Sequence, residues 1–172
     1  MGVDEGILLK DDSSRDSFGV AHALADEIKS LGCEIAFFGK QSVDFDNSIT
    51  GQVTAELLGY NSVSVVVDFK LEGSKITAER EIEGGREVVE TELPAIITTQ
   101  KGLNEPRYAS LKGIMASKKK TITEKAAAQS QKYSEIIDMN LPASKQAGRI
   151  LGTDSSAVAE LVKLLREEAK VI

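Results

Sequence analysis

The stretch best suited to bind a small ligand is GKQSVDFDNSIT, residues 39–50, a polar loop between a strand-like apolar run and a helical segment. Where a loop leads from the carboxyl end of a strand into a helix, the free N–H groups and the dipole of the helix attract phosphate. Every loop between a strand and a following helix has this placement. The spacing therefore leaves two readings open, a phosphate site and a plain connector.

A second stretch, KGLNEPRYASLKGIMASKKK at residues 101–120, has the chemistry of a contact surface. It holds six basic residues against one acid, in a chain of net charge −6. Its apolar residues, Leu103, Leu111, Ile114 and Met115, stand among glycines, a proline and polar groups. The mixture is too irregular for a helix and too apolar for a solvated loop, which favours a surface that meets a partner.

A third charged group, Glu79, Arg80 and Glu81, interrupts a β-rich run. By pattern alone this is the solvent face of an edge strand. His22 falls within a helical segment and is expected to be structural or solvent-facing. Cys33 is expected to be a buried structural thiol in an apolar strand.

The composition excludes several functions. One His and one Cys do not make a zinc site or a disulfide framework, and the acidic balance disfavours general nucleic-acid binding. No apolar run approaches the ~20 residues that span a bilayer, and the first residues lack the build of a secretory signal. Nucleophile-elbow, triad, Walker and dinucleotide-loop motifs are absent from the sequence. These features indicate a cytoplasmic or organelle-matrix binding subunit with no catalytic residues of its own.

The elements that position these stretches follow an α/β pattern. A buried strand at EGILLK is followed by a helix with Asp or Ser caps, the apolar spacing Val20, Leu24, Ile28, Leu31 and a stop at Gly32. A second buried strand, CEIAFFG, completes a βαβ unit of a parallel sheet. The next helix is expected from about Thr50 to Leu58, ended by Gly59.

The rest of the chain changes character twice. Three β-rich runs separated by EGS and EGG turns predict an antiparallel meander, after which AIITT returns to the main sheet. Residues 122–153 are expected to be an extended linker with at most one short helical turn. Residues 154–172 form an amphipathic helix capped by Asp154 or Ser155, which either packs on its own domain or docks on another chain. The expected division is 1–121, 122–153 and 154–172.

Three stretches in this order, GKQSVDFDNSITGQ, EREIEGG and LNEPRYASLKGIMASKKK, resemble the β subunits of electron transfer flavoproteins. The resemblance runs from Met1 to Ile172, the last of the three stretches being the most specific. MGVDEGILL matches an interior stretch of the family, so the sequence is expected to be a fragment or a truncated gene model. The implied fold is a Rossmann-like (adenine nucleotide α-hydrolase-like) parallel sheet with helices on both faces, antiparallel hairpins and a C-terminal arm.

The resemblance implies that the loop holds AMP, or a second FAD in electron-bifurcating members. Backbone N–H groups near Ser48 to Thr50 would face the phosphate, while Asp44 and Asp46 would fix the loop or accept from ribose hydroxyls. Many members have Gln where this chain has Ile49, which tilts the expectation toward AMP. The expected AMP-binding residues are Gly39, Lys40, Gln41, Ser42, Val43, Asp44, Phe45, Asp46, Asn47, Ser48, Ile49 and Thr50.

The resemblance also places Glu81, with Arg80 as a less certain neighbour, near the FAD held mainly by the α subunit. Residues 101–120 match the family's recognition loop for acyl-CoA dehydrogenases of fatty acid oxidation and related flavin dehydrogenases, with Leu111 as the inserted anchor. Leu103, Ile114 and Met115 are expected to hold this loop to its own domain. The expected loop residues are Leu111, Arg107, Tyr108, Lys112, Ile114 and Met115.

The implied function is that of an electron-carrier β subunit, cytoplasmic in bacteria and in the mitochondrial matrix in eukaryotes, whose tail helix packs on the α subunit. The chain alone would catalyse nothing, because the redox activity resides in the FAD of the heterodimer. Two alternatives remain. One is a bifurcating β subunit that carries a second FAD and uses NADH, and the other is a stress-protein-like nucleotide-binding regulatory domain.

Overall fold

A computed structural model describes residues 1–145 and 147–172, which divide into two compact units, Met1–Glu135 and Ile136–Ile172. The larger unit contains all the strands and the helices α1, α2 and α3. The smaller one contains a short 3-10 turn, η1 (Ser155–Ala157), and the helix α4 (Val158–Glu167). The two units are described separately.

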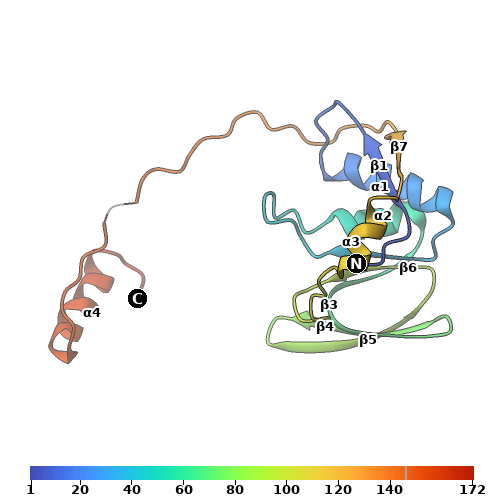
Figure 1. Cartoon of the computed structure of the whole chain (residues 1–172). Helices are drawn as coiled ribbons and strands as arrows, with labels where there is room; N and C mark the ends of the chain where they lie inside the picture. Colours follow the sequence, from blue (N-terminus) through green and yellow to red (C-terminus); the bar gives the residue numbers. More distant parts are fainter. Residues whose placement is uncertain (146) are drawn as a thin grey trace. The chain divides into compact units, whose positions relative to one another are not determined.

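The centre of the larger unit is a five-stranded sheet in the order β2-β6-β3-β4-β5 (Figure 1). Strand β6 (Ala95–Thr99) runs parallel to both β2 (Ile35–Gly39) and β3 (Asn61–Glu72). Strands β4 (Lys75–Ile82) and β5 (Gly85–Glu92) extend the sheet as an antiparallel meander. The predicted α/β class, the meander and the return of AIITT to the sheet are confirmed.

The sequence-based pairing of the first two strands is wrong. Strand β1 (Gly6–Lys10) pairs in parallel with β7 (Ile122–Ala126) in a separate two-stranded sheet, whereas β2 pairs with β6. Residues 122–126, expected as the start of a linker, therefore belong to a strand. Neither β1 nor β2 is fully buried, because each has only one strand neighbour and leaves side chains such as Leu8 and Phe37 exposed.

Helix α1 (Ser17–Leu31) begins and ends as its sequence predicts. Asp16 is the N-cap, accepting from the Gly19 N–H, and Gly32 closes the helix in the left-handed region at φ 64°. The buried face differs from the predicted stripe. Val20 and Leu31 are exposed, while the buried residues are Gly19, Ala21, Ala23 and Ala25.

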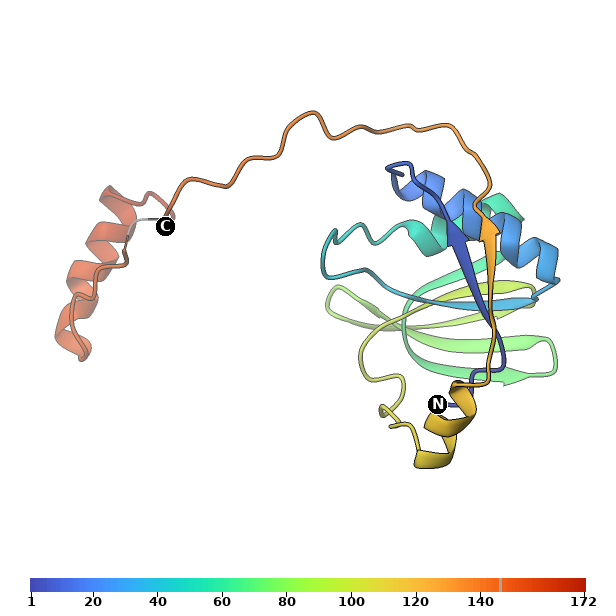
Figure 2. The same ribbon diagram turned by 45° about the horizontal axis from the view of Figure 1, so that its top comes forward.

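This pattern of small residues shows that α1 is covered on two sides. Residues two apart in a helix lie about 200° apart, so positions 19 to 25 alternate between opposite faces. Figures 1 and 2 show α1 between β1 and β7 on one side and α2 (Thr50–Leu58) on the other, with both helices on one side of the five-stranded sheet. Small side chains let α2 approach α1 closely, which periodicity of large apolar residues cannot reveal.

Helix α2 packs on β6 and β3 and ends at Gly59, with φ 69°, as predicted. Beneath it the core consists of β-strand residues packed together. They are Val63, Val66, Ile76, Ala78, Ala95 and Ile97. Cys33, expected in a buried strand, lies between α1 and β2 and is partly exposed, with its carbonyl accepting from the Tyr60 hydroxyl.

In the smaller unit, Asp154 caps the helical segment by accepting from the Ser156 N–H, as predicted. Arg149 pairs with Glu168 at 3.2 Å, which joins the chain before η1 to the end of α4. Among the described residues, no helix is both long enough and apolar enough to cross a membrane.

Candidate functional site

The loop of residues 40–49 connects the carboxyl end of β2 to the start of α2 (Figure 1). The Lys40 N–H donates to the Thr99 carbonyl at 2.9 Å, so the parallel pairing of β2 and β6 continues into the loop. The Thr99 hydroxyl donates back to the Phe38 carbonyl at 3.0 Å. Two strand ends thus fix the root of the loop.

The Gln41 side chain organises the interior of the loop. Its amide nitrogen donates to Asp46 Oδ1 at 2.7 Å, and its amide oxygen accepts from the Ser48 hydroxyl at 2.7 Å. The Asp46 N–H closes a turn on the Ser42 carbonyl at 2.9 Å. Asp46 and Ser48 hold positive φ values of 52° and 35°, which non-glycine residues adopt only when surrounding contacts compensate.

The two aspartates of the loop are occupied by contacts within it. Hydrogen bonding from the Ser42 side chain, then from backbone N–H groups including that of Phe45, lowers the pKa of Asp44. Asp46 accepts from Gln41. Both carboxylates thus stabilise the loop conformation, one of the two roles expected from the sequence.

The amino end of α2 keeps its backbone donors available. Ile49 is the N-cap and provides no side-chain hydrogen bond, so the first N–H groups of the helix lack a side-chain acceptor. In the same turn, Gln52 Oε1 is buried without a partner among the described residues. A Cβ at Gly51 would lie 2.5 Å from Thr98 Cγ2, so only glycine allows α2 this close to β6.

A contact outside the predicted set ties the loop to α1. Asn47 Nδ2 donates to the Ser17 hydroxyl at 2.8 Å, joining residues 30 positions apart in sequence. Ser17 had only helix-capping significance in the sequence, and no sequence signal indicated this pairing. The loop also leaves Val43, Phe45 and Ile49 exposed to solvent, Val43 at 98%.

Arg80 and Glu81 lie on β4 but differ in surroundings. The prediction of an edge strand is wrong, because β4 lies between β3 and β5. The Arg80 guanidinium donates to the Ser64 hydroxyl at 3.2 Å and to Glu87 at 3.3 Å, while its Nε is buried without a described partner. Glu81 is exposed and accepts one bond, from Gln100 Nε2 at 3.4 Å.

A bulge in β3 brings Ser64 to Arg80. The pairing register of β3 with β6 shifts between Val63 and Val66, and Val65 has a φ of 60°. The Val65 N–H donates to the buried Thr98 hydroxyl at 3.1 Å, which compensates in part for this unfavourable backbone. Ser64 and Thr98 had no distinguishing feature in the sequence, because a bulge depends on the pairing of distant strands.

The segment 101–120 contains a short helix, α3 (Leu111–Ser117), where the sequence suggested none. The Ser110 hydroxyl caps it by accepting from the Gly113 N–H at 3.1 Å. Leu111 is 82% exposed and Tyr108 95% exposed. Arg107 and Lys112 are exposed beside them.

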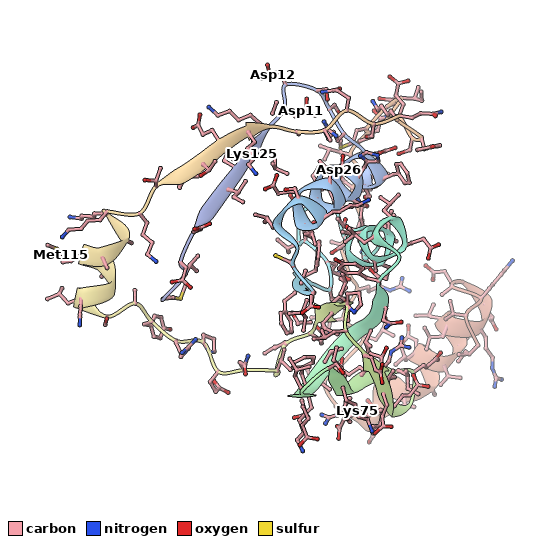
Figure 3. The ribbon with its side chains drawn as sticks, turned by 90° about the vertical axis from the view of Figure 1, so that its right-hand side faces the viewer. Asp11, Asp12, Asp26, Lys75, Met115 and Lys125 are labelled. Carbon is pink, nitrogen blue, oxygen red and sulfur yellow. The ribbon has the colours of Figure 1, made fainter. Side chains whose placement is uncertain are left out.

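The apolar residues of this segment divide between the core and the solvent. Leu103 packs against the core cluster, as predicted. Ile114 and Met115 are exposed, contrary to the expectation that they hold the loop to its own domain. Figure 3 shows Met115 on α3, and a helix of seven residues cannot bury every face against a neighbour. Exposed apolar side chains therefore extend from Leu111 to Met115.

The structure brings some of the site residues expected from the sequence close to one another. Gln100 joins Glu81 to the start of segment 101–120, and the loop of residues 40–49 adjoins the ends of β2 and β6. Within the described part of the chain, no cluster of three or more His, Cys, Asp or Glu residues offers a metal site. The described residues thus present a polar loop, a charged strand face and an exposed apolar segment.

Comparison with known proteins defines the class. The model of the electron transfer flavoprotein domain matches residues 1–130. The chain belongs to the electron transfer flavoprotein family.

Its relatives specify the branch of that family. The chain is 38% identical to the electron transfer flavoprotein subunit beta of Syntrophomonas wolfei, a match over 99% of this chain and 68% of the relative. It is 39% identical to that of Bradyrhizobium diazoefficiens, over 100% of this chain and 69% of the relative. The subunit beta of Mus musculus is 37% identical, over 96% of this chain and 68% of the relative. The resemblance found in the sequence motifs is confirmed.

Proposed function

We propose that this chain acts as the β subunit of a heterodimeric electron transfer flavoprotein, binding AMP, helping to enclose FAD and docking flavin dehydrogenases. The observation that carries the proposal is the match to β subunits over nearly the whole chain. Members of this family transfer electrons as subunits and are not enzymes in the usual sense. The proposed partner is an electron transfer flavoprotein α subunit.

The loop of residues 40–49 is the proposed AMP site. The uncapped amino end of α2 supplies N–H donors and a favourable dipole for the phosphate, and Gly51 keeps that end close to the strand termini. Asp44 and Asp46 are held by Ser42 and Gln41, which keeps their charge engaged within the loop. The aliphatic side chain of Ile49 offers no hydrogen bond, and this favours AMP over a second FAD.

Glu81 and Arg80 form the proposed flavin-facing part of the chain. When bound in the heterodimer, FAD accepts and donates the electrons. Arg80 is fixed by Ser64 and Glu87, whereas Glu81 has only the Gln100 amide as a partner. Glu81 is therefore available to hold a basic side chain of the α subunit by local electrostatic attraction.

The segment around α3 is the proposed dehydrogenase anchor. An exposed leucine surrounded by polar groups has the features of a binding hot spot, and Leu111 is 82% exposed. Arg107, Lys112 and Lys118 to Lys120 give the segment a positive field that speeds encounter with acidic partners. A small apolar anchor with charged surroundings suits a carrier that must dissociate after each transfer.

The test is to purify this chain co-expressed with an α subunit and to measure FAD and AMP per complex. We expect a stable heterodimer with one FAD and one AMP. Two flavins per complex would replace the AMP assignment with the bifurcating alternative. A chain that stays monomeric in size-exclusion chromatography beside the α subunit, with no flavin absorbance, would overturn the proposal in favour of a stress-protein-like domain.

A further inference from the structure

The exposed face of the β4–β5 hairpin carries more carboxylates than bases. Directly opposite residues in an antiparallel pair share a face, and successive residues on a strand alternate between faces. Ile76 and Ala78 of β4 point to the buried face, so Lys75 and Glu81 point to the exposed one, together with Glu92 and Arg86, which lie directly opposite them on β5. Alternation along both strands then gives all the charged residues of the exposed face. They are Lys75, Glu79, Glu81, Arg86, Glu90 and Glu92.

Both bases of this face avoid the carboxylate directly opposite and take a diagonal one. Arg86 lies opposite Glu81 in the register but its guanidinium donates to Glu79 at 3.3 Å. Lys75 lies opposite Glu92 but pairs with Glu90 at 2.9 Å, and the hydrogen bond that its ammonium donates to Glu90 is the main cause that raises the pKa of Lys75. Glu81 is thereby left with the Gln100 amide at 3.4 Å.

No other base within the described ranges replaces Arg86 at Glu81. Arg80 adjoins Glu81 in sequence but points to the other face, where Ser64 and Glu87 hold it. Lys75, labelled in Figure 3, begins β4, and six residues of strand separate it from Glu81 by about 20 Å, well beyond the screening length of about 8 Å at physiological salt. Whether a cation neutralises the Glu81 carboxylate therefore depends on which carboxylate Arg86 binds.

We propose that Glu79 is a positioning residue that keeps Arg86 away from Glu81, so that Glu81 remains an unneutralised anion for a basic side chain of the α subunit. Arg86 and Glu79 are 61% and 40% exposed at their side chains, so water screens their attraction, and Arg86 can turn to Glu81 once the carboxylate of Glu79 is removed. The choice of occupant rests on the proposed function and on charge complementarity, since the face is net anionic.

The test compares variants of this chain in complex formation with the α subunit, measured as Kd at low and at high salt. Glu79→Gln releases Arg86 to Glu81, and we expect Kd to rise about two- to five-fold, in the range that a surface ion pair supports. Arg86→Gln, alone or combined with Glu79→Gln, removes the competitor and should give Kd values at or below wild type. Glu90→Gln is the matched control: it removes a carboxylate of the same face but releases Lys75 beside Glu92, and Kd should stay unchanged.

The outcomes separate this inference from the proposed function. If Glu81→Gln leaves Kd unchanged, Glu81 does not bind the α subunit, and this inference fails while the heterodimer of the proposed function stands. If Glu81→Gln weakens binding while Glu79→Gln does not, only the role of Glu79 fails. If the double variant binds as weakly as Glu79→Gln, Glu79 contacts the partner itself, which also overturns the inference. An NMR contact between the Arg86 guanidinium and Glu81 in Glu79→Gln, absent from wild type, would give direct support.

Discussion

The loop of residues 40–49 and the segment 101–120 are both largely exposed, yet their side chains are arranged in opposite ways. In the loop, polar side chains bond to one another, with Gln41 joined to Asp46 and Ser48. In the segment, apolar side chains such as Leu111 and Met115 stand in solvent. The first arrangement is ordered by its own hydrogen bonds, whereas the second leaves apolar area exposed to solvent.

The difference indicates what each region would contribute to the binding proposed for it. A preformed polar loop reduces the ordering cost when a charged ligand binds, and it discriminates by geometry. An exposed apolar anchor gains free energy from the area it loses to water, with little geometric demand. Substitutions in the two regions should therefore have separable effects.

The largest expected effect is on stability, from a substitution in the first turn of α2, directly after the loop. Gly51→Ala places a Cβ 2.5 Å from Thr98 Cγ2, both buried, and should destabilise the chain by about 1–3 kcal/mol through overpacking. Urea denaturation of the purified chain measures this. Gly85→Ala, where a Cβ meets nothing within 4 Å, is the control and should change stability far less. Equal stability of the two variants would show that α2 does not pack this closely on β6.

Next in size is removal of the apolar anchor. Leu111→Ala should weaken dehydrogenase docking by about 2 kcal/mol, which slows electron transfer at subsaturating concentration by roughly tenfold or more, with flavin content unchanged. Stopped-flow reduction of the heterodimer by a dehydrogenase measures the rate. Val43→Ala, which changes a still more exposed apolar residue in the other region, should leave this rate at the wild-type value. A wild-type rate for Leu111→Ala would exclude it as the anchor.

A smaller effect is expected from loosening the loop. Gln41→Ala removes the acceptor of Ser48 and the donor to Asp46, and should weaken AMP binding to the heterodimer by about 1 kcal/mol, roughly fivefold. Isothermal titration after AMP removal gives the Kd. Lys112→Ala, in the second region, serves as the control. Unchanged AMP affinity for Gln41→Ala would mean that the network does not prepare the site.

The smallest effect concerns α1, whose Ser17 holds the loop and whose neighbour Asp16 holds residues 133 and 134. Hydrogen bonds from the Gly19 and Tyr133 N–H groups, with that of Ser134, lower the pKa of Asp16 from 3.8 to about 2. Because the pKa of Asp16 is lower in the folded state than in the unfolded state, its ionised carboxyl stabilises the fold at any pH above the unfolded pKa of 3.8. This stabilisation is lost as the pH falls from about 4 through 2. Amide exchange at Tyr133 and Ser134, relative to Ala127, should therefore accelerate in that window.

Two variants check this assignment. Asp16→Asn should show faster exchange at Tyr133 and Ser134 at neutral pH and should lose the acid-induced change. Asp154→Asn alters the corresponding cap of the smaller unit and should leave both amides unaffected. Acid acceleration that persists in Asp16→Asn would assign the effect to another carboxylate.

Local signals in the sequence predicted many element boundaries. The caps at Asp16 and Asp154, the glycine stops at 32 and 59 and the two turns of the meander depend on neighbouring residues, and the structure confirms them. Strand pairing was predicted less well. The partners of β1 and β2 are β7 and β6, which lie far along the chain, and spacing along the sequence does not encode such contacts.

For the candidate site too, the sequence predicted some features and not others. The sequence located the loop, the charged group of β4 and the exposed Leu111. It did not indicate that Asn47 bonds Ser17, that Ser64 holds Arg80 through a bulge, or that Arg86 selects Glu79 over Glu81. Each of these contacts depends on the register between segments distant in the chain.

By itself the sequence determined the family, the α/β class and the positions of the three polar stretches, because motifs, caps and turns act over a few residues. Only the tertiary structure decided which strands pair, why the buried face of α1 is made of glycine and alanine, and which charges of the β4–β5 hairpin remain without a cation. The physical reason is that close packing and pairing register are satisfied between segments, so their outcome appears only when those segments meet.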